Sequence, residues 1–482
     1  MLHIYNTMSA KKELFKPVSD GNIKMYVCGV TVYDLCHIGH ARSAVAFDVV
    51  RRGLEWLGMS VTYVKNFTDI DDKIINKSNA TGRPWQEITA EYIQKHNEDM
   101  DRIGVLRPSH APLATQYIKE MVEFCEKLIT GRRAYESNGD IYYRVSSFNS
   151  YGKLSRRNAD DLLAGARVDV NEQKENPLDF ALWKAAKPNE PSWESPWGKG
   201  RPGWHIECSV MSEKILQSPI DIHGGGQDLI FPHHENEIAQ SEATSGRNLA
   251  KYWMHNGFVN INKEKMSKSL GNFFTIRDIL EDTDPETLRF FLLTTHYRQP
   301  LEFADSKLIE AESSLDRIYT FKDELANAIP SKKGANDTAA AEEIYEKFYK
   351  DYKNALEDDF NTPAMLAALF DAVRMGNTLL INKVTAPVLE TLRTVCAKMF
   401  ADVENVLFVA YKNSDDWYKS NLSIPEKELN TAIESRNAAR KEKNFEGADR
   451  IRQELAAKGV ELVDTPTGTR YRTKRQRTQI LL

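Results

Sequence analysis

Residues 25–42 read MYVCGVTVYDLCHIGHAR, and this stretch decides the expected fold. Its first half is typical of a short apolar strand, and a helix is expected from near His37 through Val50. A strand that leads into a helix N-terminus presents free backbone N–H groups and the positive end of the helix dipole to a phosphate. His37 and His40 share one helix face, and Gly39 between them lets a flat base approach the backbone. The stretch therefore predicts a nucleotide-binding turn, although a His-x-x-His pair alone is more often structural.

Strands and helices alternate on either side of this turn. Val61–Val64 reads as a second strand and Ile220–His223 as another, which ends in the glycines of 224–226. This alternation predicts a Rossmann-like, doubly wound parallel sheet formed by residues 1–110 and 200–300. Ligands bind beyond the carboxyl ends of such strands. Thr68 lies at one of these ends, and Asp228 could hold ribose hydroxyls.

The other segments have different patterns. Residues 111–199 include an Asn138-Gly139 hairpin signal between aromatic runs and are interpreted as an insertion that splits the nucleotide-binding domain. Residues 301–410 repeat apolar side chains at three- and four-residue steps, which predicts a helical bundle. Residues 413–417 read as a linker, and residues 420–482 as a small C-terminal domain with a helical hairpin and a β unit. The chain is thus expected to form several domains.

The composition limits the cellular compartments in which the protein could work. The chain has 482 residues, a net charge of −5 and five scattered cysteines, a pattern that suits a reducing compartment rather than a disulfide scaffold. We find no apolar run of the roughly 18 residues that a membrane helix needs, and residues 1–17 lack the pattern of a secretion signal. A cytoplasmic protein without a membrane anchor is expected. Residues 470–477 form a local basic tail that could follow a nucleic-acid backbone.

Two cysteines, one histidine and one glutamate could hold a metal ion. His233 and Glu237 are four residues apart and share a helix face, and Cys28 and Cys208 would complete a set of accepted zinc ligands. Burial of both cysteines as small hydrophobic residues explains the composition equally well. His234 should point about 100° away from His233, and Cys36 has no partner at metal spacing. We expect that neither His234 nor Cys36 binds the metal ion directly.

Further motifs make a family resemblance visible. Lys265–Ser269 reads KMSKS, and together with the His37–His40 motif it resembles the signature of the class I aminoacyl-tRNA synthetases. Gly203–Cys208 (GWHIEC), His223–Gly226 (HGGG) and Phe231–Glu237 (FPHHENE) make the chain similar to the cysteinyl-tRNA synthetases in particular. The likeness is dense from about residue 25 to 297, and it resumes at 445–449 and 464–469.

The resemblance implies an activity and a set of site residues. Cysteine and ATP, with Mg²⁺, would form cysteinyl-adenylate, and the amino acid would pass to the terminal 2′-hydroxyl of tRNA(Cys). It implies zinc, which senses the substrate thiolate and so excludes serine, held by Cys28, Cys208, His233 and Glu237. It implies catalytic roles for His37, His40, Lys265 and Lys268. It implies nucleotide binding by Gly39, Asp228 and Lys268, and cysteine binding by Thr31, Thr68, Trp204, His205 and His223. A monomer, with an anticodon-reading C-terminal unit, is the family's common form.

Two rival functions share some of these features. A ligase that activates cysteine in the same way but joins it to an amino sugar would resemble the catalytic half. The Asp464–Thr469 unit and the basic tail favour tRNA instead. A non-catalytic RNA-binding protein with a structural zinc would have a closed metal site and would need no intact KMSKS motif.

Overall fold

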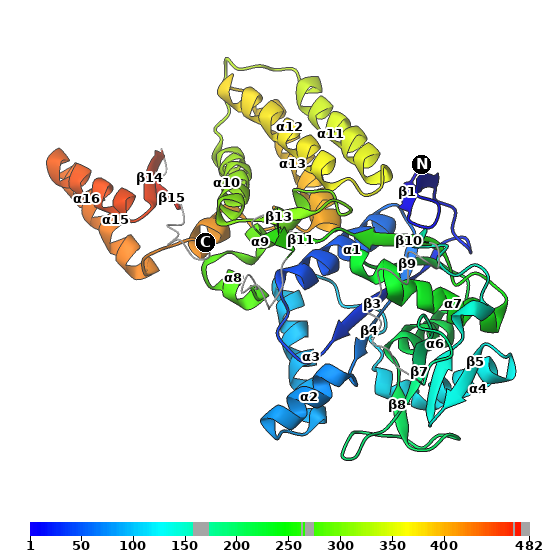
Figure 1. Ribbon diagram of the computed structural model, residues 1–482. Helices are drawn as coiled ribbons and strands as arrows, with labels where there is room; N and C mark the ends of the chain where they lie inside the picture. The colour runs from blue at the N-terminus through cyan, green and yellow to red at the C-terminus, as the bar shows by residue number, and fades with distance from the viewer. Residues whose placement is uncertain (158–172, 262–263, 266–273, 466–467, 474–482) are drawn as a thin grey trace.

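A parallel four-stranded sheet lies at the centre of the molecule (Figure 1). The structure is a computed structural model that describes residues 1–157, 173–261, 264–265, 274–465 and 468–473. The strand order is β10-β9-β3-β4, and all neighbours run parallel. The bounds are β3 Asn22–Thr31, β4 Ser60–Thr68, β9 Ile220–Gly226 and β10 Ala250–Asn256. The predicted sheet is confirmed, and the three glycines after His223 continue its strand β9.

Both faces of this sheet are covered by helices, which is why β3 is apolar on both sides. Met25 and Val27 belong to one hydrophobic core, and Tyr26 and Cys28 to the other. Helix α1 packs on one face and α6 on the other. The bounds of the helices in this half are α1 Ile38–Trp56, α2 Asp72–Thr81, α3 Trp85–Arg102, α6 Trp204–Leu216 and α7 Glu235–Ser245.

The segment between α3 and α6 forms a separate antiparallel sheet of order β5-β6-β7-β8. Asn138 and Gly139 both have positive φ and connect β5 to β6 as the hairpin signal predicts. This sheet shares a core with Cys28 and Cys208 and therefore borders the proposed metal ligands. Its elements are η1 Ala114–Tyr117, α4 Ile118–Thr130, β5 Ala134–Ser137, β6 Asp140–Tyr143, η2 Val145–Ser147, β7 Phe180–Ala185 and β8 Gly200–Pro202.

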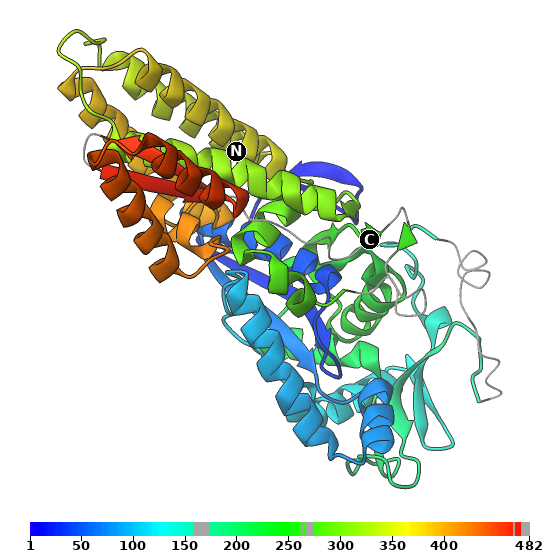
Figure 2. The ribbon, with the colours of Figure 1, turned by 90° about the vertical axis from the view of Figure 1, so that its left-hand side faces the viewer.

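The helical bundle packs directly on α1 and shares its core (Figure 1). A β-carbon at Gly53 of α1 would lie 2.7 Å from Leu356 Cδ1, so a larger residue would force the Leu356 side chain to shift. Figure 2 shows the bundle and the inserted antiparallel sheet at opposite ends of the molecule. The helices are α8 Ile276–Asp282, α9 Pro285–Leu293, α10 Asp305–Asn327, α11 Ala339–Glu357, α12 Thr362–Ile381 and α13 Ala386–Leu407. The remaining strands of this half are β1 His3–Asn6, β2 Lys11–Leu14, β11 Val259–Ile261, β12 Glu264–Lys265 and β13 Leu301–Phe303.

Helix α12 is long and apolar enough to cross a membrane by length and composition alone. In the structure it packs against α11, α13 and α10 as part of the bundle. Its buried residues include Met365, Leu366 and Leu369, which belong to the shared core.

The C-terminal segment has a small core of its own, built from Leu429, Leu455, Val460 and Leu462. The predicted linker at 413–417 is wrong, because Asn413 caps a short helix, α14. Trp417 of this helix is fully buried and stacks on Tyr319, with ring centroids 4.6 Å apart. The elements are α14 Ser414–Ser420, α15 Glu426–Lys441, α16 Phe445–Ala457, β14 Val460–Thr465 and β15 Gly468–Thr473.

A buried carboxyl joins α9, α10 and the chain that follows α13. Glu286 accepts hydrogen bonds from Tyr319 Oη at 2.8 Å and Ala410 N at 2.6 Å. Burial raises the pKa of Glu286 from 4.5 to about 7, although Lys412 lies nearby. The folded state therefore keeps a proton that the unfolded state releases, so the contribution of Glu286 to stability is fully present below pH 4.5 and is lost as pH rises through about 7.

Replacing Glu286 by glutamine should remove part of this pH dependence. The shift corresponds to roughly 3 kcal/mol of stability, since one pKa unit is about 1.4 kcal/mol. The thermal midpoint should fall less between pH 5 and pH 8 in Glu286→Gln than in the unmodified chain. Glu302 is exposed, and Glu302→Gln serves as the control. Its thermal midpoint should fall with pH as steeply as that of the unmodified chain. An equal fall of the thermal midpoint with pH in all three proteins would contradict the raised pKa of Glu286.

Candidate active site

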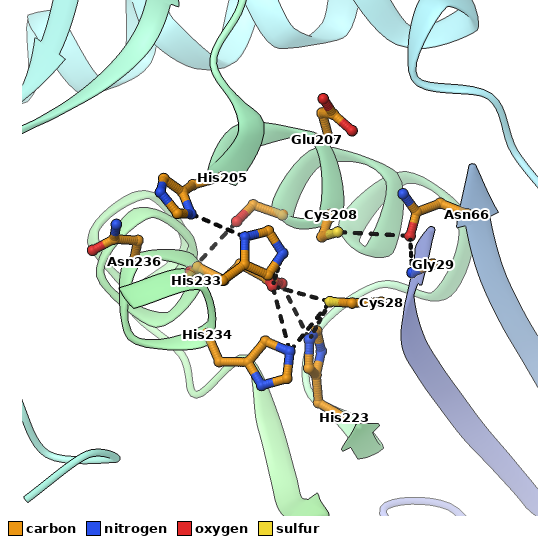
Figure 3. Close-up of polar contacts among 12 residues, drawn as sticks. Cys28, Gly29, Asn66, His205, Glu207, Cys208, His223, His233, His234 and Asn236 are labelled. Carbon is orange, nitrogen blue, oxygen red and sulfur yellow. Dashed lines mark hydrogen bonds and ion pairs between the residues drawn. The ribbon is translucent and has the colours of Figure 1, made fainter. Parts of the chain in front are cut away.

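Four side chains from four elements converge near the carboxyl end of β3. Cys28 comes from β3, Cys208 from α6, His233 from the helical turn η4 (Ile230–His234) and Glu237 from α7, which follows it directly. Their ligand atoms lie within 4.8 Å of one another, and all four side chains are buried. Cys28 Sγ donates to Glu237 Oε1 at 3.2 Å, and His233 Nε2 lies 3.0 Å from the same oxygen. Figure 3 shows Cys28, Cys208 and His233 pointing towards one another. We call these residues the four-residue cluster.

The charges of the four-residue cluster suit a bound cation. Burial disfavours the Cys208 thiolate, but hydrogen bonds with Cys28 and His233 lower the pKa of this thiol to about 6. Burial raises the pKa of the Cys28 thiol. The Glu237 carboxyl is also buried, yet the neighbouring imidazoles of His223 and His233 hold its pKa well below the usual range. Thiolate and carboxylate groups are therefore available as ligands for a soft divalent ion.

A second grouping shares two members with the first. His223 and His234 also lie with Cys28 and Glu237 within 4.8 Å of one another. His234 Nε2 is 3.3 Å from Cys28 Sγ, so the expectation that His234 points away is wrong. The reason is the position of Glu237, which is four residues after His233 and three after His234, so both imidazoles lie beside its carboxylate, at 3.0 Å and 3.9 Å.

Outer partners hold these imidazoles in place. His205 Nδ1 lies 2.9 Å from His233 Nδ1, and the Trp204 ring stacks on His233 with centroids 4.2 Å apart. His234 Nδ1 contacts His255 Nε2 at 2.8 Å (Figure 3 shows His234 beside the cluster). Such partners fix the ring orientation of histidines that ligate metals. The sequence analysis did not identify His255, which is more than twenty residues from His233.

A cavity of about 460 Å³ extends from Cys28 to the start of α1. Its walls include six residues that the sequence analysis singled out for substrates and nucleotide. They are Thr31, His37, Gly39, His40, Trp204 and Asp228. The other three predicted cysteine contacts, Thr68, His205 and His223, do not line this cavity, and His205 lines a second cavity instead. Thr68 Oγ1 donates to Glu207 at 2.6 Å, and His223 is fully buried beneath the cluster.

The His37–His40 motif has a specific cap geometry at the start of α1. The His37 side chain accepts from Gly39 N at 3.1 Å, and His40 Nδ1 accepts from His37 N at 3.2 Å. The two rings stack with centroids 3.7 Å apart. Both imidazoles therefore sit at the cavity wall with fixed orientations.

Asn66 places Cys28 from the neighbouring strand. Its Oδ1 accepts from Gly29 N at 2.9 Å and lies 3.7 Å from Cys208 Sγ (Figure 3). A β-carbon at Gly29 would lie only 1.5 Å from the Asn66 carbonyl oxygen. Glycine is thus required for the two strands to approach so closely beside the cluster.

The described residues beside the KMSKS motif lie near the His37 motif. Lys265 belongs to β12, whose backbone pairs with β11, while Lys268 falls outside the described residues. Beyond the motif, Phe274 O accepts from Ile38 N at 3.3 Å, and Ile276 N donates to Cys36 O at 2.9 Å. The two signature motifs, some 230 residues apart, therefore have neighbouring attachment points.

Comparisons with known proteins agree with this geometry. Residues 14–313 match the family model of the "tRNA synthetases class I (C) catalytic domain", and residues 351–406 match a DALR domain. Cysteine–tRNA ligase of Trichlorobacter lovleyi is 50% identical over 98% of this chain and 100% of that protein. Cysteine–tRNA ligase of Geobacter sp. strain M21 is 51% identical, with the same coverage.

Solved structures share the fold at lower identity. Mycobacterium tuberculosis methionyl-tRNA synthetase in complex with methionyl-adenylate aligns with a TM-score of 0.60 and 14% identity, over 84% of this chain and 94% of that chain. A putative arginyl-tRNA synthetase from Campylobacter jejuni aligns with a TM-score of 0.55 and 14% identity, over 81% and 94%.

Proposed function

The chain belongs to the cysteine–tRNA ligase family of the class I aminoacyl-tRNA synthetases, and we propose that its four-residue cluster selects the amino acid. It is an ATP-dependent ligase that joins cysteine to tRNA. The observation that carries the proposal is the buried cluster of Cys28, Cys208, His233 and Glu237 at one end of the substrate cavity.

The donor set of the cluster fits zinc. Two thiols, an imidazole and a carboxylate are all accepted zinc ligands, and the depressed pKa of Cys208 and Glu237 provides the required anions. Bound zinc would supply direct coordination of the substrate thiolate, for which a serine hydroxyl is a poor substitute. A pocket without such a contact separates near-isosteres by only about 10- to 200-fold. We assign Cys28, Cys208, His233 and Glu237 as the ligands, and Trp204 as a wall beside the bound amino acid.

The first step is attack of the cysteine carboxylate on the α-phosphorus of ATP, which forms cysteinyl-adenylate and releases pyrophosphate. ATP with its Mg²⁺ occupies the cavity, its base near Gly39 and its ribose near Asp228. We assign phosphate stabilisation to His37, His40, Lys265 and Lys268. We assign Thr31, which lines the cavity, to the bound cysteine, together with Thr68, His205 and His223, which lie outside the cavity lining. Catalysis is then mainly positioning and electrostatic stabilisation, without a protein nucleophile.

In the second step the terminal 2′-hydroxyl of tRNA(Cys) attacks the adenylate. A further cavity of about 730 Å³ lies against the inserted sheet and is lined by Lys174, Lys184, Arg201 and Phe231. Basic and aromatic side chains suit a single-stranded RNA end, so we propose that residues 111–199 hold the acceptor end. We assign anticodon reading to residues 420–482 beyond the 301–410 bundle, and we propose a cytoplasmic monomer.

Pyrophosphate exchange followed by charging of total tRNA tests this function. Exchange should depend on cysteine, and serine should support it more than about 200-fold less efficiently, beyond what a plain pocket achieves. Charging with cysteine should follow. Cysteine-dependent exchange without charging would contradict tRNA ligation and favour an amino-sugar acceptor. Absence of exchange in the zinc-loaded protein would contradict the enzyme assignment and leave an RNA-binding module.

A further inference from the structure

One lysine in the substrate cavity has no role in the scheme above. Lys65 lies on β4 opposite Val27 of β3, and its backbone N–H donates to His110 O at 3.1 Å. Its side chain is partly buried and lines the same cavity as His37 and His40. It therefore lines one cavity together with Cys28 of the cluster and the start of α1.

The Lys65 ammonium has no counter-ion among the residues that the structure describes. No carboxylate there lies within 4.0 Å of it, and its side chain donates no hydrogen bond. By contrast, Lys77 of α2 lies 3.8 Å from Asp34 and donates to Tyr92 Oη at 2.8 Å. An ammonium group without a partner is costly to bury.

The groups nearest to Lys65 do not supply the missing charge. Burial raises the pKa of Cys36 to about 12, so this thiol stays neutral, and its Sγ contacts His96 Nδ1 at 3.2 Å. Burial likewise lowers the pKa of Lys65 to about 8, which leaves the side chain mainly cationic at neutral pH. A positive charge thus faces the cavity, and the described part of the chain provides no anion for it.

We propose that Lys65 binds the α-phosphate of ATP and of the adenylate, an assignment that rests on the proposed function. The substrates bring two kinds of anion into this cavity, the cysteine carboxylate and the phosphates. The carboxylate loses its charge when it becomes the mixed anhydride. The non-bridging oxygens of the α-phosphate stay negative in ATP, in the transition state and in the adenylate. Only the α-phosphate can therefore serve as a counter-ion throughout the first step.

Two variants at this position separate charge from packing. Lys65→Met keeps a long unbranched side chain without charge, and Lys65→Arg keeps the charge. In pyrophosphate exchange, Lys65→Met should lower kcat/KM for ATP about 30-fold, the size expected for one charged hydrogen bond. Lys65→Arg should stay within about threefold of the original value. Affinity for AMP should fall in Lys65→Met, whereas affinity for adenosine should not change.

The melting temperature separates a phosphate-binding lysine from a structural one, because only the loss of a structural lysine should lower it. Removing a partly buried charge that no described residue pairs should leave the melting temperature of Lys65→Met unchanged or raise it. Lys322 is the matched control, because burial also lowers its pKa to about 8, yet it donates to Ala410 O at 2.7 Å. Lys322→Met should lose stability and keep its affinity for AMP.

Three results would overturn the proposal. The first is unchanged AMP affinity and ATP kinetics in Lys65→Met. The second is destabilisation of Lys65→Met like that of Lys322→Met. The third is weaker binding of cysteine, but not of cysteinol or AMP, which would assign Lys65 to the carboxylate. AMP binding that depends on Lys65 in a protein without cysteine-dependent exchange would refute the proposed function and leave the phosphate contact standing.

Discussion

Replacing Cys208 by serine should remove bound zinc and cysteine activation together. The Cys208 sulfur is buried within 4.8 Å of the other three ligand atoms of the cluster, and the pKa of its thiol is lowered to about 6. A serine hydroxyl at this position is far harder to ionise and is a poorer zinc ligand. Loss of an outer partner of a metal ligand costs about 10- to 100-fold. Loss of a ligand itself should therefore reduce cysteine-dependent pyrophosphate exchange by more than about 100-fold.

Metal analysis and exchange assays on the same preparation test this expectation. Cys125→Ser is the matched control, because Cys125 is a fully buried thiol in α4 outside both metal groupings. It should lose some stability but keep its zinc and its exchange activity. Normal zinc content and normal exchange in Cys208→Ser would refute the proposed ligand set. Zinc retained by Cys208→Ser but lost in a His223 and His234 double variant would favour the second grouping.

Removal of the C-terminal segment should separate the two steps of the reaction. We expect a chain that ends at Asn421 to form the adenylate within about threefold of the full chain. Its charging of tRNA should fall by more than about 100-fold, because two linked modules bind a ligand at least about 100-fold more tightly than one of them alone. The physical reason is that the small core of Leu429, Leu455, Val460 and Leu462 is separate from the core that contains α1 and the bundle.

The structure decides where this truncation must fall. A cut after Asn413 would remove Trp417, which fills the bundle core and donates from Nε1 to Asp316 at 2.9 Å. A protein that ends at Asn421 keeps the Trp417 contact and loses the ion pairs that Arg470 and Arg472 form with Asp323 in the bundle. Charging of a short acceptor-stem RNA should be equal in both proteins. An equal fall in adenylate formation and in tRNA charging would show that the proposed domain division is wrong.

Local features were predicted well because their physical causes are local. The strand of residues 25–31 and the helix after His37 follow from apolar patterning and from capping within a few residues. The hairpin at Asn138-Gly139 and the bundle helices follow for the same reason. Asn444 also caps α16 as expected, since its side chain accepts from Gly447 N at 2.9 Å.

Errors arose where a distant contact overrode the local signal. Asn413–Trp417 is polar apart from the tryptophan and reads as a linker, but the Tyr319 ring stacks on Trp417 and fixes a helix there. His234 was expected to point about 100° away from His233 and to stay outside the metal ligands. The fold instead places Cys28 of β3 against this turn, so His234 Nε2 lies 3.3 Å from Cys28 Sγ and 3.9 Å from Glu237.

The sequence by itself determined the class of fold and the residue types of the site. The His37 motif, the KMSKS motif and the ligand-type residues near positions 208 and 233 are all visible in the printed chain. Only the tertiary structure decided which of these residues meet, because Cys28 and Cys208 are brought together by strand β3 and helix α6 across 180 positions. It also revealed His255 behind the cluster and, in the cavity, a Lys65 side chain that no described residue pairs. A missing counter-ion is a property of three-dimensional surroundings, and no pattern along the chain encodes it.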